Sequence, residues 1–335
     1  MITMGSFLED YQNGQALGKS LEKFILKNPH HELAIGMKKI HSALKTTGKN
    51  EGIIAEVNQI DYKKFAVEEQ LVFFELLCHL MSQEKRFSTA RSILASAKRL
   101  VTPTIPVEFQ CIPLSLEANF YFYEGSFKKQ AETILIELSI LKPNSGRYIV
   151  LYWTYLILLA FMNEFEKLDY HIKEFEKIPN IQDLPVSLDY IKLITNTEKC
   201  NFKENESILA KIKADKPLSS IKSGVEDYEH FYHIIQFNEL PIIDEKDRSQ
   251  WDLLSLNCLM KNDFKSALEW IHKYADQTII YKLLSNLGSY TLIRAELANK
   301  NINTAELYLE SKKKIDNTSI FDDFAINKTL SLKKK

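Results

Sequence analysis

The chain has few residues that interrupt helices, since its 335 residues include only ten glycines and nine prolines. The prolines fall mostly near expected helix ends, so long helices can form between them. Hydrophobic residues make up 45% of the chain, which is enough apolar surface to bury. At this length a single continuous core is unfavourable, which indicates two domains or an elongated solenoid. The composition therefore predicts an all-α fold.

Cysteine is scarce, and the four cysteines at positions 78, 111, 200 and 258 have no close spacing. No zinc-binding pattern can be written from them, and we expect reduced, buried thiols as in a cytoplasmic protein. The first residues, MITMGSFLEDYQ, lack the apolar stretch of a secretory signal peptide. The expected location is therefore the cytoplasm.

An excess of charge of one sign is also missing, because 43 basic and 44 acidic residues give a formal net charge of −1. A nucleic-acid-binding protein usually carries a basic stripe, whereas the basic runs here are short, at residues 312–314 and 333–335. We expect these runs to be a solvated helix end and a frayed tail. Nucleic acid is not an expected partner.

Only one long hydrophobic run occurs, IVLYWTYLILLAFM at residues 149–162. A membrane-spanning helix needs about 20 apolar residues, and a shorter run is more typical of a buried core helix. Membrane insertion is therefore not expected. A helix that is apolar all round must be covered, either by the curvature of the fold, by the N-terminal segment, or by a bound amphipathic helix or hydrophobic peptide.

Catalytic motifs are missing too, with no glycine-rich phosphate loop, no GxSxG elbow and no HExxH. Glu226, Glu229, His230 and His233 share one expected helix, but the two histidines are only loosely neighbours at about 100° per residue. A solvated or packed helix is the favoured interpretation, and residues 30–32 (His-His-Glu) form an ordinary surface feature. We expect no catalytic residue, no metal and no cofactor, and we do not expect an enzyme.

The chain does contain a recurring unit, an aromatic residue followed three positions later by a small or apolar one. Successive anchors stand roughly 40 residues apart, with one longer interval, and this period indicates stacked helical hairpins. The anchors are Phe87, Phe127, Phe165, Phe202, Phe264 and, weakly, Ile302.

Three hairpins carry a fuller pattern around these anchors. The best has Trp251, Leu254, Ser255 and Cys258, then Asp263, Phe264, Ala267, Ile271 and Tyr274. The next has Phe74, Leu77, Cys78 and Met81, then Phe87, Ala90, Leu94, Ala97 and Pro103. A third has Tyr152, Tyr155, Leu156 and Leu159, then Phe165, Leu168, Ile172 and Phe175. In the hairpin of Phe127 the register is open by one residue, because Ala131, Leu135 and Leu138 fit the second helix better.

These residues resemble the tetratricopeptide-repeat family over roughly residues 68–315. The resemblance implies a right-handed α-solenoid of stacked antiparallel helix hairpins, with a concave surface that binds a protein or peptide. The expected parts are an N-terminal cap, degenerate repeat or separate effector module at 1–65, a first solenoid half at 66–217, an inserted helix and acidic loop acting as a hinge at 218–247, C-terminal repeats at 248–316, and a capping helix with a basic tail at 317–335.

Residues 1–65 are expected to contain two helices of their own, at about 15–27 and 30–46. Asn28-Pro29 precedes the second helix, at a position that favours a helix start. Gly48 and Gly52 are expected to bracket a break before the first repeat.

In such a solenoid the first helix of each hairpin lines the concave surface. The expected partner-binding residues on it are Glu75, His79, Trp153, Ile157, Asp252, Tyr290 and Arg294. Chaperone-binding relatives need Lys and Asn where this chain has Glu75 and His79, so recognition of chaperone tails is not expected. The expected function is a scaffold or adaptor. The alternative is a peptide-responsive sensor that resembles the tetratricopeptide quorum-sensing regulators of low-GC bacteria.

Overall fold

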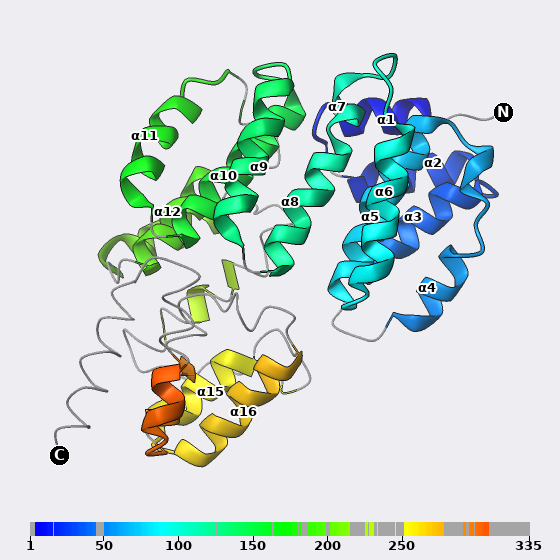
Figure 1. The fold of residues 1–335 in the computed structure, drawn as a ribbon. Coiled ribbons are helices and arrows are strands. Elements are labelled where there is room, and N and C mark those ends of the chain that lie inside the picture. Colours follow the sequence, from blue (N-terminus) through cyan, green and yellow to red (C-terminus); the bar gives the residue numbers. More distant parts are fainter. Residues whose placement is uncertain are drawn as a thin grey trace. The chain divides into compact units, whose positions relative to one another are not determined.

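The computed structural model describes the chain in segments: residues 4–15, 17–44, 50–124, 126–162, 164–179, 181, 187–198, 202–214, 225–226, 228–230, 233, 245, 251–277, 291–292, 295–297 and 299–307. Within these segments the regular structure is helical and contains no strand, which confirms the all-α prediction (Figure 1). The chain divides into two compact units. Unit 1 is Met1–Tyr155 with Glu176–Pro185, and unit 2 is Leu156–Phe175 with Val186–Lys335.

The N-terminal part of unit 1 is made of short helices packed in sequence. They are α1 (Gly5–Gln12), α2 (Leu17–Lys27), α3 (Glu32–Ala43), α4 (Glu51–Val57) and the 3-10 turn η1 (Tyr62–Lys64). α2 packs on α1 and α3, and α3 packs on α5 (Val67–Gln83). The two helices expected at 15–27 and 30–46 are confirmed. The sequence pattern does not predict α1 or α4, and Gly52 lies inside α4 instead of in the expected break.

The hairpins expected from the anchors follow. In unit 1, α5 pairs with α6 (Phe87–Leu100), and α8 (Ile112–Glu124) pairs with α9 (Phe127–Ile140). The short α7 (Val107–Gln110) connects them, and α8 packs against both α5 and α6 (Figure 1). The boundary between the units falls within α10 (Gly146–Phe161).

Unit 2 repeats the same pairing. Its helices are α11 (Phe165–Phe175), α12 (Leu188–Glu198), the 3-10 turn η3 (Phe202–Glu204), α13 (Asn205–Ala214), α15 (Trp251–Met260) and α16 (Phe264–Gln277). α12 packs on α13, and α15 packs on α16.

Every anchor found in the sequence is the first residue of the second helix of its hairpin. Phe87 begins α6, Phe127 begins α9, Phe165 begins α11 and Phe264 begins α16. Phe202 begins η3, which runs directly into α13, and Ile302 begins the helical residues 302–307. The anchors therefore mark one recurring turn geometry.

That turn closes in the same way in five hairpins. The N–H of the residue before the anchor donates to the carbonyl five residues earlier, as in the Schellman helix end. The pairs are Arg86 to Met81 at 2.8 Å, Ser126 to Tyr121 at 2.8 Å, Glu164 to Leu159 at 3.0 Å, Asp263 to Cys258 at 2.9 Å and Asn301 to Glu296 at 2.9 Å. Two residues before the anchor the backbone is left-handed, with φ of 60° at Lys85, 61° at Asn262 and 63° at Lys300.

A second recurring contact joins the two helices of a hairpin through small residues. Cys78 Sγ lies 3.6 Å from the carbonyl oxygen of Ala90, and Ser255 Oγ donates to the carbonyl of Ala267 at 2.6 Å. Ala90 and Ala267 are fully buried. A side chain larger than alanine would separate the two helices at these crossings.

The register of the Phe127 hairpin is settled by burial. α9 begins at Phe127, and Gln130, three positions later, is buried like Ala90. Leu135 would point inward in the shifted register but is 42% exposed. Ala131 and Leu138 of the shifted register are buried too, so the exposure of Leu135 is what favours the spacing counted from Phe127.

The apolar run at residues 149–162 forms most of α10 and the turn after it, and most of its side chains are buried. No helix in the described segments combines the length and apolarity that a bilayer crossing requires. The hinge expected at 218–247 lies mostly outside the described residues, and the tail at 317–335 lies wholly outside them.

Candidate functional site

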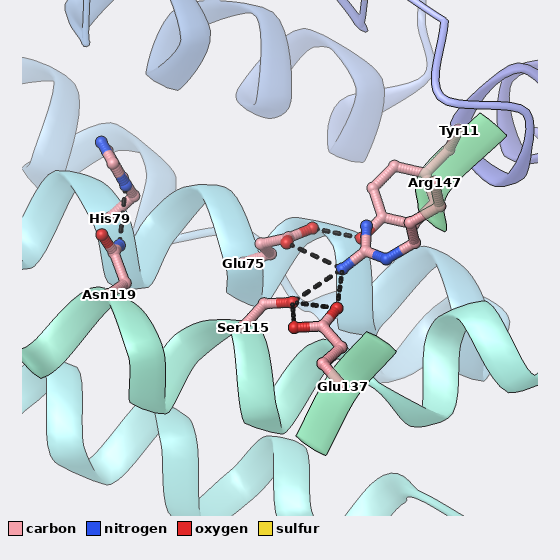
Figure 2. Close-up of polar contacts among 7 residues, drawn as sticks. All are labelled: Tyr11, Glu75, His79, Ser115, Asn119, Glu137 and Arg147. Carbon is pink, nitrogen blue, oxygen red and sulfur yellow. Dashed lines mark hydrogen bonds and ion pairs between the residues drawn. The ribbon is translucent and has the colours of Figure 1, made fainter. Parts of the chain in front are cut away.

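Four polar residues on the first helices of two successive hairpins come together in unit 1. Glu75 and His79 lie one turn apart on α5, and Ser115 and Asn119 lie one turn apart on α8. All four are half-buried, and Asn119 Nδ2 lies 2.7 Å from His79 Nδ1 (Figure 2). We call these four residues the polar row.

Arg147, near the start of α10, lies beside one end of the polar row. Its guanidinium reaches Tyr11 of α1, Glu75 of α5, Ser115 of α8 and Glu137 of α9 (Figure 2). Nη2 donates to Ser115 Oγ at 2.8 Å and lies 3.3 Å from a carboxylate oxygen of each glutamate. Nη1 donates to the Tyr11 hydroxyl, which in turn donates to Glu75. One guanidinium therefore links α1, α5, α8, α9 and α10.

Ser115 and Glu137 complete this network. The Ser115 hydroxyl lies 2.8 and 2.9 Å from the two carboxylate oxygens of Glu137, so it donates to Glu137 while it accepts from Arg147. The Glu137 side chain is 0% exposed and that of Arg147 is 13% exposed. The Nε atom of Arg147 is buried without a hydrogen-bond partner among the described residues.

Burial and charge act against each other in the network. Burial raises the pKa of Glu137 above its ordinary range, and the nearby Arg147 cation opposes that rise. Burial alone would lower the pKa of Arg147, but Tyr11, Glu75 and Glu137 raise it above its ordinary value. Arg147 therefore stays charged, and its loss would leave a buried carboxylate without a cation.

His79 stays neutral in the polar row. Burial lowers its pKa below the ordinary value, although the Glu75 carboxylate and the Asn119 amide act in the opposite direction. A neutral imidazole can accept the Asn119 amide proton at Nδ1. The row therefore combines one carboxylate with three neutral polar groups.

α1 is held tightly against the network. The backbone N–H of Met4 donates to Glu69 Oε1 at 2.6 Å, and the Tyr11 ring stacks on Phe109 with centroids 5.5 Å apart. A Cβ atom on Gly146 would lie 1.9 Å from the carbonyl oxygen of Asn13, so only glycine allows the two segments to cross there. α1 is therefore part of the unit 1 core.

Of the other expected binding residues, Trp153, Ile157 and Asp252 lie in the part of the chain that the structure describes. Trp153 is 9% exposed and therefore buried, and Ile157 is half-buried. Asp252 is 7% exposed, and burial raises its pKa to about 7. Tyr290 and Arg294 lie outside the described residues.

Five residues of the site were not predicted from the sequence: Tyr11, Ser115, Asn119, Glu137 and Arg147. Ser115 and Asn119 follow Glu75 and His79 by the same number of residues that separates Phe127 from Phe87. The repeat spacing therefore contained a signal for both residues. Tyr11 and Arg147 carry no such signal, because their contact joins positions 136 residues apart.

Two other polar clusters do not assemble into a site. Glu229 lies 3.9 Å from His233, but the described residues contain no group of three or more potential ligands that could hold a metal. His31 caps α3, because its Nδ1 accepts the N–H of Ala34 at 3.3 Å.

Three of the four thiols expected to be reduced and buried can be placed, and Cys200 lies outside the described residues. Cys78 and Cys111 are free and buried, and burial raises the pKa of each to about 12, so both are inert at neutral pH. Cys258 is free but only half-buried, because Ser255 takes the close-packed position on that helix.

Comparisons of the chain with protein-family models, with curated proteins and with solved structures found no match.

Proposed function

We propose that this protein is a helical-repeat scaffold or adaptor that binds a peptide segment of another protein along the first helices of its hairpins. The polar row lies at the centre of the proposed surface. One observation carries the proposal: two successive hairpins place the same register positions side by side and leave them partly exposed. A repeated polar position on neighbouring helices suits an extended or helical peptide better than a small molecule.

The proposed arrangement is tetratricopeptide-like and right-handed. It is supported by the packing of α8 on both helices of the preceding hairpin and by the small-residue crossings at Ala90 and Ala267. The common turn before each anchor gives each hairpin the same local geometry.

The groups of the polar row suit peptide recognition. The Asn119 amide and the His79 ring can bond peptide N–H and C=O groups, and Glu75 adds a negative charge at the row's end. Glu75 is already paired with Arg147 and Tyr11, which holds its carboxylate in one place. A preorganised site of this kind binds with a smaller entropic penalty.

The scaffold is favoured over the peptide-responsive sensor by the placement of the N-terminal helices. A separate effector module would move independently of the repeats. Instead, Met4, Phe7 and Tyr11 of the α1 segment are buried in one core with α5, and α3 packs on α5. This supports a cap on the first repeat.

We propose no chemistry for the protein itself. The Ser115 hydroxyl is engaged by both Arg147 and Glu137, and the His79 ring contacts Asn119, so neither is arranged as a nucleophile with its base.

The test is affinity capture from the native cell extract, read by mass spectrometry. The double variant His79→Ala/Asn119→Ala removes two side chains of the row, and Ser92→Ala on the exposed side of α6 is the matched control. Circular dichroism and thermal unfolding verify that each variant is folded. We expect one protein captured by wild type and control but lost from the double variant. Equal capture by all three would rule out the polar row as the binding surface.

A further inference from the structure

A second surface, separate from the polar row, lies on the outer side of α9. Leu135, Ile136 and Ile140 are 42%, 53% and 46% exposed, and helical spacing places the three on one side of the helix. We call these three side chains the α9 face. It lies on the second helix of its hairpin, whereas the polar row lies on first helices.

The equivalent helices show that this face is not required by the repeat. Counted from the anchor, the positions of Leu135 and Ile136 carry small or polar residues in the other hairpins. They are Ala95 and Ser96 in α6, Lys173 and Glu174 in α11, and His272 and Lys273 in α16. Leu135 is 42% and Ile136 is 53% exposed, so burial in the core does not account for the aliphatic pair. Exposed aliphatic clusters mark interaction sites.

The charged residues around the α9 face indicate which charges a partner surface should carry. Lys128 and Lys129 are exposed on the same side at the start of α9, and Lys142 is exposed just after its end. Glu132, the one exposed acidic residue of the helix, lies on the same side one turn before Leu135 and Ile136, so three lysines and one carboxylate leave the surroundings of the α9 face net positive. An apolar centre with a basic rim fits a surface with an apolar centre and acidic ends.

We propose that the α9 face docks one amphipathic helix of a partner protein, with an aliphatic stripe at i, i+3, i+4 spacing and acidic residues at its ends. A second copy of this chain fits less well. A stable dimer buries about 800 Å² on each partner, more than three side chains of one helix supply. A two-fold interface through α9 would also bring lysines against lysines.

The probe for the test is a fluorescein-labelled synthetic helix with leucines at i, i+3, i+4 and i+7 and glutamates at both ends, titrated into the full chain. The variant Leu135→Lys/Ile136→Glu copies the pair found in α11 and changes only exposed positions. The control Ala95→Lys/Ser96→Glu makes the same change in α6. A second probe replaces the glutamates with lysines.

We expect the acidic probe to bind wild type and the α6 control equally and the α9 variant at least about tenfold more weakly. The lysine probe should bind wild type at least about tenfold more weakly than the acidic probe. No binding of the acidic probe up to about 1 mM, equal binding by the α9 variant, or equal binding of both probes would overturn the proposal. If the wild-type protein is a dimer and the α9 variant is a monomer, the α9 face binds a second copy of the chain, and the proposed partner helix is wrong.

Discussion

Arg147 is the residue on which the polar structure of unit 1 depends. It is the cation between two carboxylates, one of them fully buried, and it also holds Tyr11 and Ser115. A buried ion pair adds little stability over an apolar replacement of the whole group, but removal of one partner leaves an unpaired charge.

Arg147→Met should therefore lower the free energy of unfolding by about 3–5 kcal/mol. The loss should be smaller at pH 5 than at pH 8, because Glu137 without its cation is more readily protonated. Chemical denaturation at the two pH values measures both effects. Lys98→Met is the control, because it breaks the exposed pair with Glu117 and should cost at most about 1 kcal/mol. Equal losses in the two variants would refute the assigned role of Arg147.

Asp252 predicts a pH dependence of stability. Burial raises the pKa of Asp252 from 3.8 to about 7 in the folded protein, so the folded state binds this proton more tightly than the unfolded state. The contribution of Asp252 to stability is then fully present below pH 3.8, the ordinary pKa of the group, and it is lost as the pH rises to about 7.

Asp252→Asn keeps the side chain neutral and should remove this loss. Relative to wild type, the variant should gain stability across that pH range, by up to about 4 kcal/mol at pH 8. The measurement is the melting temperature of both proteins at several pH values. A difference between them that does not change with pH would show that Asp252 ionises normally.

At the scale of the element, the recurring unit is the turn between the two helices of a hairpin. Lys85, Asn262 and Lys300 adopt the left-handed conformation that glycine adopts without strain, and the sequence has Gly125 at the equivalent place in the second hairpin.

Lys85→Gly should stabilise unit 1 by about 1 kcal/mol, because it relieves the left-handed strain of a residue with a Cβ atom. Lys85→Ala separates this effect from loss of the lysine side chain and should leave stability unchanged. Equilibrium denaturation of the three proteins gives the comparison. A destabilised glycine variant would mean that the turn carries no strain.

Ala267→Leu should destabilise unit 2 by about 1–3 kcal/mol, because the larger side chain overpacks the crossing where Ser255 bonds the Ala267 carbonyl. Lys265→Leu places the same side chain at an exposed position of α16 and should change stability little. If thermal unfolding finds the two leucine variants equally stable, the α15–α16 crossing is not the close contact described.

The elements that the sequence could predict are those with a local signal. The anchors predict where the second helices begin, since an aromatic residue recurs with the repeat at Phe87, Phe127, Phe165 and Phe264. The same period relates Glu75 and His79 to Ser115 and Asn119. α1 and its contact with Arg147 have no local signal, because they depend on tertiary packing over long sequence separations. The burial of Trp153 is likewise decided by neighbours that no periodicity specifies.

At the scale of the whole molecule, both units contain paired helices, and unit 1 has two surfaces that differ in character. The polar row offers paired polar groups on first helices, and the α9 face offers aliphatic side chains with a basic rim. If the two proposals hold, these surfaces would allow the protein to bind two partners at once.

The most direct test of the central claim is site-specific photo-cross-linking in the native cells. A photoreactive amino acid replaces Asn119 in one protein and Ser92, on the exposed side of α6, in another. We expect a discrete cross-linked polypeptide from position 119 and none from position 92. No adduct at position 119, or the same adducts from both positions, would contradict a binding surface on the first helices.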